Sequence, residues 1–365
     1  MGIPLIRCNK VNVLRKEDTH LQYIGMDTHI STLDFAVVND TGRLIKTASV
    51  STSVKNFMEF VRKVDRPRIV YMEEGTLAAW ALEVCLRFDE KLVITDAREN
   101  HWIGSIGQKN DPLDAFKLAQ LARGGYVKEV HHPAGDRRRF RELMEAYHDT
   151  VRGTTRIKNK IKAKFRQNGV MCPGCTVYRE AFREEWKAKL PNETAQLILA
   201  GLWNQLEQFE QTEKQLIAAA KNQAKHYSEI KLFEAVPGIG FISAATISAI
   251  LETPHRFANK RKVWMYAGLG LTKRSSGGKT YSESLSKDYN RLLKYSLKQA
   301  AEVVIRASDN PFRRKYLNMT LYHGVVPHRA KLTVARDILA TIWAMWKTGE
   351  KYNPEIREKA ACKQG

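Results

Sequence analysis

The sequence has few cysteines, no long apolar run and a deficit of acidic residues, and each shortage excludes a class of protein. Its five cysteines are an odd, scattered set, which argues against a disulfide framework and favours a reducing cytosol. No stretch approaches the ~18 uninterrupted apolar residues of a transmembrane helix, and residues 1–21 lack the apolar core of a signal peptide. We therefore expect a cytoplasmic protein with no membrane partner.

The deficit of acidic residues leaves a large positive charge. Lys and Arg number 60 against 39 Asp and Glu, so the formal net charge is +21 at pH 7. Such an excess favours a polyanionic partner, most often nucleic acid, although a merely basic protein has the same composition. With 43% hydrophobic residues the chain can build packed cores, and its 365 residues predict two or three domains.

The first third of the chain predicts three strands joined by hairpin turns, followed by alternating helices and strands. The predicted strands are Tyr23–Asp27, Thr32–Val38, Arg43–Val50, Arg68–Met72 and Lys91–Thr95. The predicted helices are Val54–Val64, Leu77–Phe88 and Asp111–Leu121. This element order is that of the ribonuclease-H-like fold, which collects metal-binding carboxylates at strand ends and on a helix.

Acidic residues occur where such a fold would bring them together. Asp27 ends the first strand, and Glu73 and Glu74 follow the fourth. Asp111 and Asp114 share one face of a predicted helix. Each has an ordinary explanation, as a solvent-facing strand end or as an acid in a helix's first turn. Together, in a basic chain, they predict a site for a hard cation, Mg²⁺ or Mn²⁺.

The middle of the chain predicts two long helices with a break between them. The first, within residues 136–170, is strongly basic, and the second, from Ala195 to Ala220, has coiled-coil-like spacing with Glu213 in the apolar seam. This pattern predicts a protruding hairpin that packs on itself or on another subunit, or an ordinary intramolecular bundle. We interpret Cys172–Pro173–Gly174–Cys175 as the turn at its tip, because no second Cys/His pair lies nearby to complete a metal site.

The last third contains two glycine-rich features. Pro237–Gly238–Ile239–Gly240 fits either a backbone approach to phosphates or a tight turn between helices. Ser275 and Ser276 stand before Gly277–Gly278 among basic residues, in either a nucleophile loop or a plain loop. His29, further upstream, is interpreted as a turn residue.

These passages together resemble the IS110 family of insertion-sequence transposases, which includes IS1111 and Piv-like invertases. The matching passages are Tyr23–His29, Met72–Gly75, Lys109–Ala115, and Val236–Gly240 leading to Ala267–Leu269 and Ser275–Lys279. They occur in the family's order and cover most of the chain. The departures are the adjacent pair Glu73–Glu74, the adjacent pair Ser275–Ser276, and Ser286–Asn290 in place of the family's usual Lys/Arg-Gly run.

The resemblance implies an α/β domain with a RuvC-like (ribonuclease-H-like) fold, a helical coiled-coil arm, and a mainly helical transposase domain. The implied boundaries are a leader at 1–20, the RuvC-like domain at 21–130, the arm at 131–230, the transposase domain at 231–350 and a polar tail at 351–365. The implied metal ligands are Asp27, Glu73, Asp111 and Asp114, holding Mg²⁺ or Mn²⁺, and the implied nucleophile is Ser276.

The same resemblance implies DNA recombination through a covalent phosphoserine–DNA intermediate. The implied partners are DNA (the element's ends and its target), a non-coding bridge RNA, and further copies of the chain, as dimers that assemble into tetramers. The implied location is the prokaryotic cytoplasm, in association with the nucleoid during the reaction. The basic stretch Arg137–Arg166 is the expected nucleic-acid contact, with binding that weakens as salt rises.

Two other functions fit the residues. A RuvC-like structure-specific nuclease, such as a junction resolvase, would use the same four carboxylates with water as nucleophile and would not need Ser276. A non-enzymatic nucleic-acid scaffold would leave those carboxylates as helix caps and surface groups, and Asp27→Ala would not change its binding.

Overall fold

The computed structural model describes residues 20–98, 111–276 and 279–355, with side chains for all of these except 111–112 and 273–282. The expected leader, apart from its last residue, and most of the expected tail lie outside the described residues. The chain divides into two compact units, Met1–Asp136 and Arg137–Gly365. Within the described residues, no helix combines the length and apolarity needed to cross a membrane.

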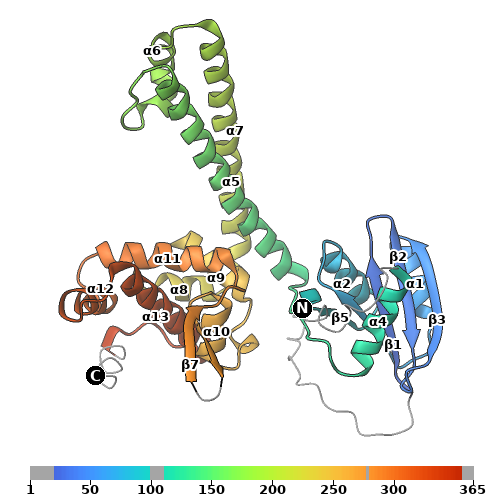
Figure 1. The fold of residues 1–365 in the computed structure, drawn as a ribbon. Helices are drawn as coiled ribbons and strands as arrows, with labels where there is room; N and C mark the ends of the chain where they lie inside the picture. The colour runs from blue at the N-terminus through green and yellow to red at the C-terminus, as the bar shows by residue number, and fades with distance from the viewer. Residues whose placement is uncertain (1–19, 99–110, 277–278, 356–365) are drawn as a thin grey trace. The chain divides into compact units, whose positions relative to one another are not determined.

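A five-stranded mixed sheet forms the centre of the first unit (Figure 1), in the order β3-β2-β1-β4-β5. β2 pairs antiparallel with β1 and β3, and β4 pairs parallel with β1 and β5. The strands are β1 (Gln22–Thr28), β2 (Thr32–Val38), β3 (Leu44–Ser51), β4 (Arg68–Glu73) and β5 (Leu92–Thr95). The helices are α1 (Val54–Arg62), α2 (Ala78–Arg87) and α4 (Asp111–Arg123). The order and type of elements predicted from the sequence are confirmed.

The two faces of this sheet bury different partners. Met26 and Met72, neighbours on β1 and β4, lie in one core with Phe57 of α1. Tyr71 points to the opposite face, where it packs against Leu118 of α4. Because successive strand residues alternate between faces, the odd-numbered residues of β1 and β4 face α4. This alternation decides which carboxylates share a side of the sheet.

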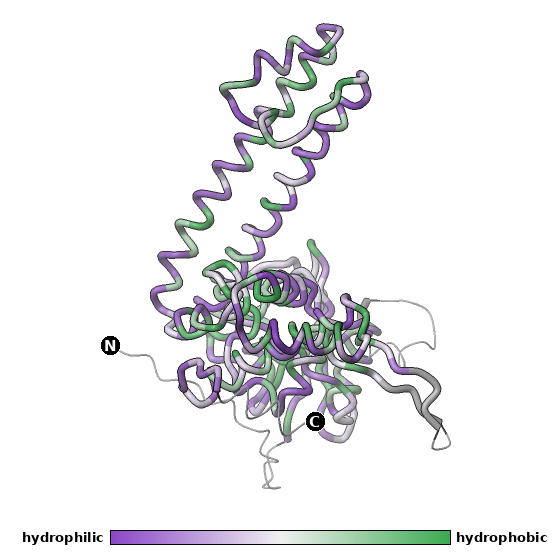
Figure 2. Tube along the Cα trace, turned by 90° about the vertical axis from the view of Figure 1, so that its left-hand side faces the viewer, coloured by the Kyte–Doolittle hydropathy of each residue, from purple (hydrophilic) through white to green (hydrophobic). Residues whose placement is uncertain are grey.

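Two long helices of the second unit form an antiparallel hairpin, called here the arm (Figures 1 and 2). They are α5 (Gly135–Gln167) and α7 (Glu193–Ala224), and hydrophilic and hydrophobic residues alternate along both. Ile161 and Phe165 pack with Trp203 and Leu206 near the tip. The segment between them contains η1 (Thr176–Tyr178), η2 (Glu180–Phe182) and α6 (Arg183–Ala188). The helices therefore pack on each other within one chain.

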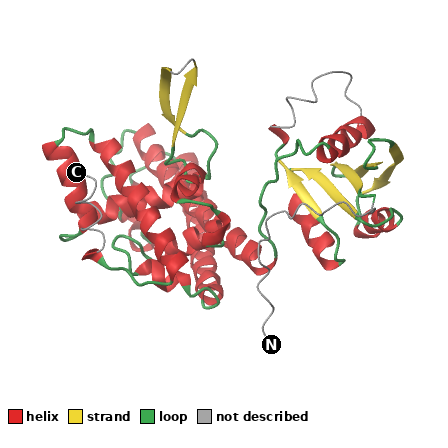
Figure 3. Cartoon of the chain, turned by 90° about the horizontal axis from the view of Figure 1, so that it is seen from below, coloured by secondary structure: helices red, strands yellow, loops and turns green. Residues whose placement is uncertain are grey.

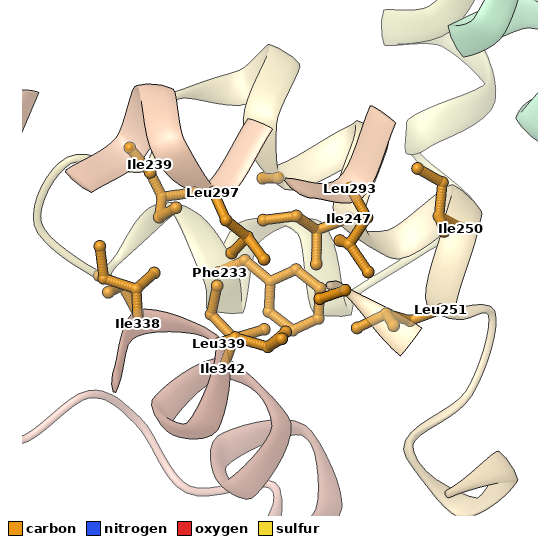
Figure 4. Packing of buried hydrophobic residues seen from close by; sticks show 14 of the residues in the cluster. Phe233, Ile239, Ile247, Ile250, Leu251, Leu293, Leu297, Ile338, Leu339 and Ile342 are labelled. Carbon is orange, nitrogen blue, oxygen red and sulfur yellow. The ribbon is translucent and has the colours of Figure 1, made fainter. Parts of the chain in front are cut away.

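The remaining elements form a helical body around a large apolar core. They are α8 (Glu229–Glu234), α9 (Phe241–Leu251), η3 (Pro254–Arg256), α10 (Lys260–Tyr266), β6 (Leu271–Ser276), β7 (Lys279–Leu285), α11 (Arg291–Arg306), α12 (Pro311–Leu317), the π-helical η4 (Asn318–Tyr322) and α13 (Pro327–Thr348). Phe233 lies among Ile247, Leu297, Leu339 and Ile342 (Figure 4). Burial of side chains from four helices stabilises the body, since each large apolar side chain contributes about 1.5–3 kcal/mol.

The base of the arm is attached to this body by polar contacts. The Arg137 guanidinium donates to Glu229 Oε1 at 2.7 Å and lies 3.9 Å from the centre of the Tyr227 ring. Ser248 Oγ donates to the same carboxylate oxygen at 2.6 Å. Further along α5, His148 Nε2 lies 2.9 Å from Thr246 Oγ1. These contacts fix where α5 leaves the helical body.

Candidate metal centre and serine hairpin

The register of the sheet places Asp27 beside Glu73. Met26 pairs with Met72 across the parallel strands β1 and β4, so the next residues on each strand, Asp27 and Glu73, are neighbours at the carboxyl ends of these strands. Both have the odd-numbered position that faces α4. Asp27 keeps a third of its side chain exposed, and Glu73 is exposed. Two of the predicted ligands therefore share one edge and one face of the sheet.

Helix α4 covers this face at unusually close range because β1 has a glycine there. A β-carbon built on Gly25 would lie 2.0 Å from the carbonyl oxygen of Ala115 and 2.8 Å from the amide nitrogen of Ala119. The helix starts at Asp111 near the strand ends and runs back along the strands, so that Leu118 reaches Tyr71. Its first turn is therefore on the side of the sheet that presents Asp27 and Glu73.

Asp114 lies in that first turn and has a cationic neighbour. Lys117 Nζ is 3.1 Å from Asp114 Oδ1, and Lys117 is 26% exposed. Asp111 begins the helix, but its side chain lies outside the described side chains. The sequence did not single out Lys117, although three-residue spacing on a helix predicts such a pair.

The adjacent glutamates have different surroundings. Glu73 is the last residue of β4 and pairs with Thr95 of β5. Glu74 is past the strand, and its Oε1 lies 3.4 Å from Nε2 of His132. Strand alternation points Glu73 to the α4 face, whereas Glu74 has a histidine partner elsewhere. These observations favour Glu73 over Glu74 as the carboxylate of the site.

His29 does more than form a turn. It follows β1, as the turn interpretation requires, and its Nε2 lies 3.3 Å from Oδ2 of Asp27. A histidine at this distance can donate to the carboxylate or hold its orientation.

Asp34 is a carboxylate that the sequence analysis overlooked. It lies directly opposite Asp27 in the antiparallel pairing of β1 and β2, and it is 4% exposed. The signal was present in the sequence, because Asp34 is the one charged residue within an otherwise apolar strand that folds back on the strand of Asp27. Opposed residues of an antiparallel pair share a face, so Asp34 also faces α4.

The carboxylates fit a hard divalent cation by their chemistry. Oxygen donors suit Mg²⁺ and Mn²⁺, and two opposed carboxylates, one of them buried, require a compensating positive charge. Among the described residues, no three His, Cys, Asp or Glu side chains come close enough to hold a metal ion by themselves. The predicted ligand set includes the Asp111 side chain, which is outside that search.

The predicted serines lie on a two-stranded hairpin of the second unit, formed by β6 and β7 (Figure 3). Ser276 is the last residue of β6 and pairs with Lys279, the first of β7; Ser275 pairs with Thr280. The register shifts between Arg274 and Ser275, an irregularity that is common beside active sites. Both serine side chains lie outside the described side chains.

Much of the expected basic helix is internally neutralised. Arg138 and Arg141 pair with Glu142 and Glu145, one turn further along α5, and Lys158 pairs with Glu210 of α7. Arg152 also has an acidic partner, Asp149, three residues before it on α5. One face of α5, nearer the tip, still gathers several basic side chains. That face forms a shallow hollow lined by Arg152, Thr155, Arg156, Asn159, Lys160, Ala163 and Arg166.

A second basic surface adjoins the serine hairpin. Helix α11 begins six residues after β7 ends, and it exposes Arg291, Tyr295 and Lys298 at spacings of four and three. Lys294 on the same side lies 4.2 Å from the Tyr289 ring centre. In the described part of the chain, neither Arg291 nor Lys298 pairs with a carboxylate. Free cations interleaved with an exposed tyrosine suit a nucleic-acid backbone and its bases.

The glycine turn before α9 is explained by packing. Gly238 has φ +85°, and a β-carbon there would lie 2.7 Å from the carbonyl oxygen of Ala300. This glycine lets the turn pack against α11, which favours the tight-turn explanation over an approach to phosphate. At the arm's tip, Cys172 and Cys175 are free thiols in the connection after α5, in agreement with the expected turn.

Comparison with known proteins identifies two matching family models. A model described as Transposase IS116/IS110/IS902 family matches residues 230–317. A second, DEDD_Tnp_IS110, described as a transposase, matches residues 24–168. Together they cover the sheet with its carboxylates, the first arm helix, and the part of the body from α8 to α12, which includes the serine hairpin.

Curated relatives have similar descriptions. The transposase for insertion sequence element IS1111A of Coxiella burnetii is 24% identical over 253 residues, 67% of this chain and 68% of that protein. A probable family 20 transposase of Pseudomonas aeruginosa is 24% identical over 263 residues, 68% of this chain and 75% of that protein. An uncharacterized 43.6 kDa protein of insertion element IS110 from Streptomyces coelicolor is 27% identical over 121 residues, 33% of this chain and 29% of that protein.

Proposed function

Since the chain belongs to the IS110 family of insertion-sequence transposases and is therefore a DNA transposase, we propose that it cuts and rejoins DNA with a serine nucleophile and a carboxylate-held divalent metal ion. The nucleophile is Ser276, and the carboxylates are Asp27, Glu73, Asp111 and Asp114. The observation that carries the proposal is the register of β1 and β4, which sets Asp27 beside Glu73 on the face covered by α4.

The first unit supports the assignment of a RuvC-like, ribonuclease-H-like domain to residues 21–130. Its sheet order and its mixture of antiparallel and parallel pairs agree with that fold. A DEDD transposase domain implies dependence on a divalent metal ion, and Mg²⁺ or Mn²⁺ suits the oxygen donors. When bound, the ion would offset the charge that develops on the phosphate oxygens.

The chemistry assigned to Ser276 is a balanced phosphoryl transfer. Its hydroxyl oxygen attacks a DNA phosphorus, so an O–P bond forms and the bond from phosphorus to a sugar oxygen breaks. The serine proton passes to a carboxylate or water, and the leaving sugar oxygen takes up a proton. Attack by a different DNA hydroxyl on the phosphoserine reverses these steps and joins new ends. No net hydrolysis occurs, which distinguishes recombination from nuclease action.

The serine and the carboxylates lie in different structural units. We propose that the hairpin of one subunit completes the metal centre of another, within dimers that assemble into tetramers. Ser276 lies at the far end of β6, beside the hairpin's connection, a position from which a strand pair can reach a neighbouring chain.

Nucleic-acid contacts are assigned to the two basic surfaces. The face of α5 with Arg156, Lys160 and Arg166 is proposed to hold the non-coding bridge RNA, and the α11 surface with Arg291 and Lys298 is proposed to hold the DNA backbone next to the serine hairpin. Base pairing between RNA and DNA would then select the element ends and the target, while the protein reads backbone and shape. A cytoplasmic, nucleoid-associated location follows from this proposal.

A covalent-trap assay tests the proposal. Protein, RNA from the element's flanks, labelled donor and target DNA, and Mg²⁺ are mixed, denatured and separated on a gel. The expected result is a protein–DNA adduct that Ser275→Ala retains and that Ser276→Ala and Asp27→Ala abolish. Nicked DNA without an adduct, still dependent on Asp27, would indicate a RuvC-like nuclease that uses water. Binding without cleavage in every variant would indicate a scaffold.

A further inference from the structure

The connection between α12 and α13 presents three large apolar side chains to solvent. Leu321, Tyr322 and Val326 are 71%, 82% and 58% exposed. Single exposed apolar residues are ordinary on a protein surface, but a group of them indicates a contact with a partner. Residues 318–329, called here the apolar–basic loop, therefore form a candidate binding surface, and they lie outside the ranges that the two family models match.

The helical body holds this loop at both of its ends. The loop begins with the π-helical turn η4, whose Met319 packs against the apolar core. Thr320 Oγ1 donates to the carbonyl oxygen of Tyr316 at 3.0 Å, and the Val325 amide donates to the carbonyl oxygen of Met319 at 2.9 Å. At its other end α13 begins at Pro327 and packs beside α12 (Figure 1). A partner therefore meets a turn that is already ordered, which lowers the entropic cost of binding.

The charge around the loop favours a polyanion. No Asp or Glu occurs anywhere in residues 310–336. The acids that flank this stretch, Asp309 and Asp337, pair with Arg314 and Lys315. Arg329 is exposed in the first turn of α13, and among the described residues it pairs with no carboxylate. A second copy of the chain that docked loop to loop would bring like charges together, whereas phosphates would be attracted.

An exposed tyrosine and leucine near an unpaired cation have the chemistry that recognises an unpaired base. An aromatic ring stacks on the face of a base, an aliphatic side chain enters an opened base step, and a cation pairs with the neighbouring phosphate. A DNA transposase has such bases to hold, because exchanging strands requires base pairs near the cut to open and to form again with a new strand.

We propose that the apolar–basic loop binds unpaired DNA. Tyr322 stacks on a base, Leu321 lies against the adjacent base step, and Arg329 pairs with the phosphate between them. The loop is a third nucleic-acid surface, in addition to those of α5 and α11. Its binding requires neither the metal centre nor Ser276.

The test compares two DNA probes that differ only in pairing. Fluorescence anisotropy measures the affinity of the full-length protein for a duplex with a short single-stranded gap and for the same duplex without the gap. EDTA is present, so the result is independent of the metal centre. Tyr322→Ala should weaken binding to the gapped probe about tenfold, and binding to the intact duplex by no more than about twofold.

Two matched variants isolate the aromatic ring. Tyr322→Phe keeps the ring and should bind the gapped probe within about twofold of the wild type. Tyr126→Ala removes a tyrosine of the first unit that is 70% exposed, and it should change neither affinity. In addition, 2-aminopurine in the gap, whose fluorescence falls when it stacks, should be quenched by the wild type and by Tyr322→Phe but not by Tyr322→Ala.

The neighbours of Tyr322 have their own readouts. Leu321→Ala should also weaken binding to the gapped probe more than binding to the intact duplex. Arg329→Ala should weaken binding to both probes and lower the slope of log affinity against log salt by about 1. The Tm of each variant should equal that of the wild type, because the substituted side chains are exposed.

Equal losses on the two probes after Tyr322→Ala, or no loss on either, would overturn the proposal. So would a loss in Tyr322→Phe as large as that in Tyr322→Ala, since the ring would then not be the binding group. A loss confined to a single-stranded RNA of the same sequence would assign the loop to RNA. A lower sedimentation coefficient of Tyr322→Ala would assign it to a contact between subunits, and either result would exclude the DNA contact.

Discussion

A β-carbon on Gly25 would lie 2.0 Å from the carbonyl oxygen of Ala115, so β1 and α4 are in backbone contact close to Asp27 and Asp114, two carboxylates of the proposed metal centre. The contact fixes the height of α4 above the sheet. It thereby sets how far Asp114, one residue before Ala115, lies from Asp27, two residues after Gly25. A glycine that looks like part of an ordinary strand is thus a determinant of the site.

Gly25→Ala should displace α4 and damage both stability and the site. We expect a loss of about 1–3 kcal/mol in the free energy of unfolding, as is typical of overpacking, together with loss of Mg²⁺-dependent DNA cleavage. Urea denaturation and a cleavage assay measure the two effects. Gly201→Ala on α7 is the control, because nothing lies within 4 Å of its β-carbon position and alanine favours a helix. Equal effects of both substitutions would contradict this account of Gly25.

His148 should make the second unit sensitive to acid. Burial, aided by the nearby Arg152, lowers the pKa of His148 to about 4 from its usual 6.5. The unfolded chain therefore binds a proton at a higher pH than the folded one, so the contribution to stability is complete above pH ~6.5 and is lost between ~6.5 and ~4. At pH 5 the loss should be about 2 kcal/mol.

Urea unfolding at pH 7.5 and pH 5 in the wild type and in His148→Gln measures this effect. Gln keeps a group that can bond to Thr246 and removes the titration, so the variant should show a smaller drop between the two pH values. An identical drop in both proteins would assign the acid sensitivity to other groups.

Lys160→Ala combined with Lys164→Ala should weaken RNA binding by a similar factor for all sequences. The cause is loss of phosphate contacts, so the slope of log affinity against log salt should fall by about 1–2. Lys158→Ala is the control on the same helix, since Glu210 already neutralises that lysine at 2.9 Å. Unchanged affinity and salt slope in the double variant would exclude this face of α5 as the RNA contact.

Arg291→Ala combined with Lys298→Ala should weaken DNA binding about tenfold at moderate salt, because two unpaired cations beside the serine hairpin are removed. The adduct at Ser276 should still form at high protein concentration. Arg306→Ala is the control on the same helix, because Glu302 holds that guanidinium at 2.5 Å. A filter-binding titration measures the affinities, and equal losses in the double variant and the control would contradict a DNA contact at the start of α11.

The sequence predicted the strands and helices of the first unit well because local patterns determine them. Alternating apolar residues, turn residues and the acids Asp27, Glu73 and Asp96 at the ends of three of the strands are all visible without the fold. Asp34 was missed because its importance depends on register: only the pairing of β1 with β2 places it opposite Asp27. His132 likewise becomes a partner of Glu74 only through the fold, since 58 positions separate them.

The charge of the arm was overestimated for a different reason. Arg138 and Arg141 were counted as a nucleic-acid surface, but Glu142 and Glu145 lie four residues further along the same helix and neutralise them. Four-residue spacing in the sequence was sufficient to predict both pairs. The close approach of Gly25 to Ala115 and of Gly238 to Ala300 could not be predicted from the sequence. Only tertiary contacts decide whether the β-carbon position of a glycine is free or is occupied by other atoms.

The most direct test of the central claim is to identify the residue that carries DNA during the reaction. The trapped adduct is digested with nuclease and protease, and the modified peptide is sequenced by mass spectrometry. We predict a phosphonucleotide remnant on Ser276, formed only with a divalent metal ion and absent from Asp27→Ala. A remnant on another residue, or cleaved DNA with no modified peptide, would contradict the account.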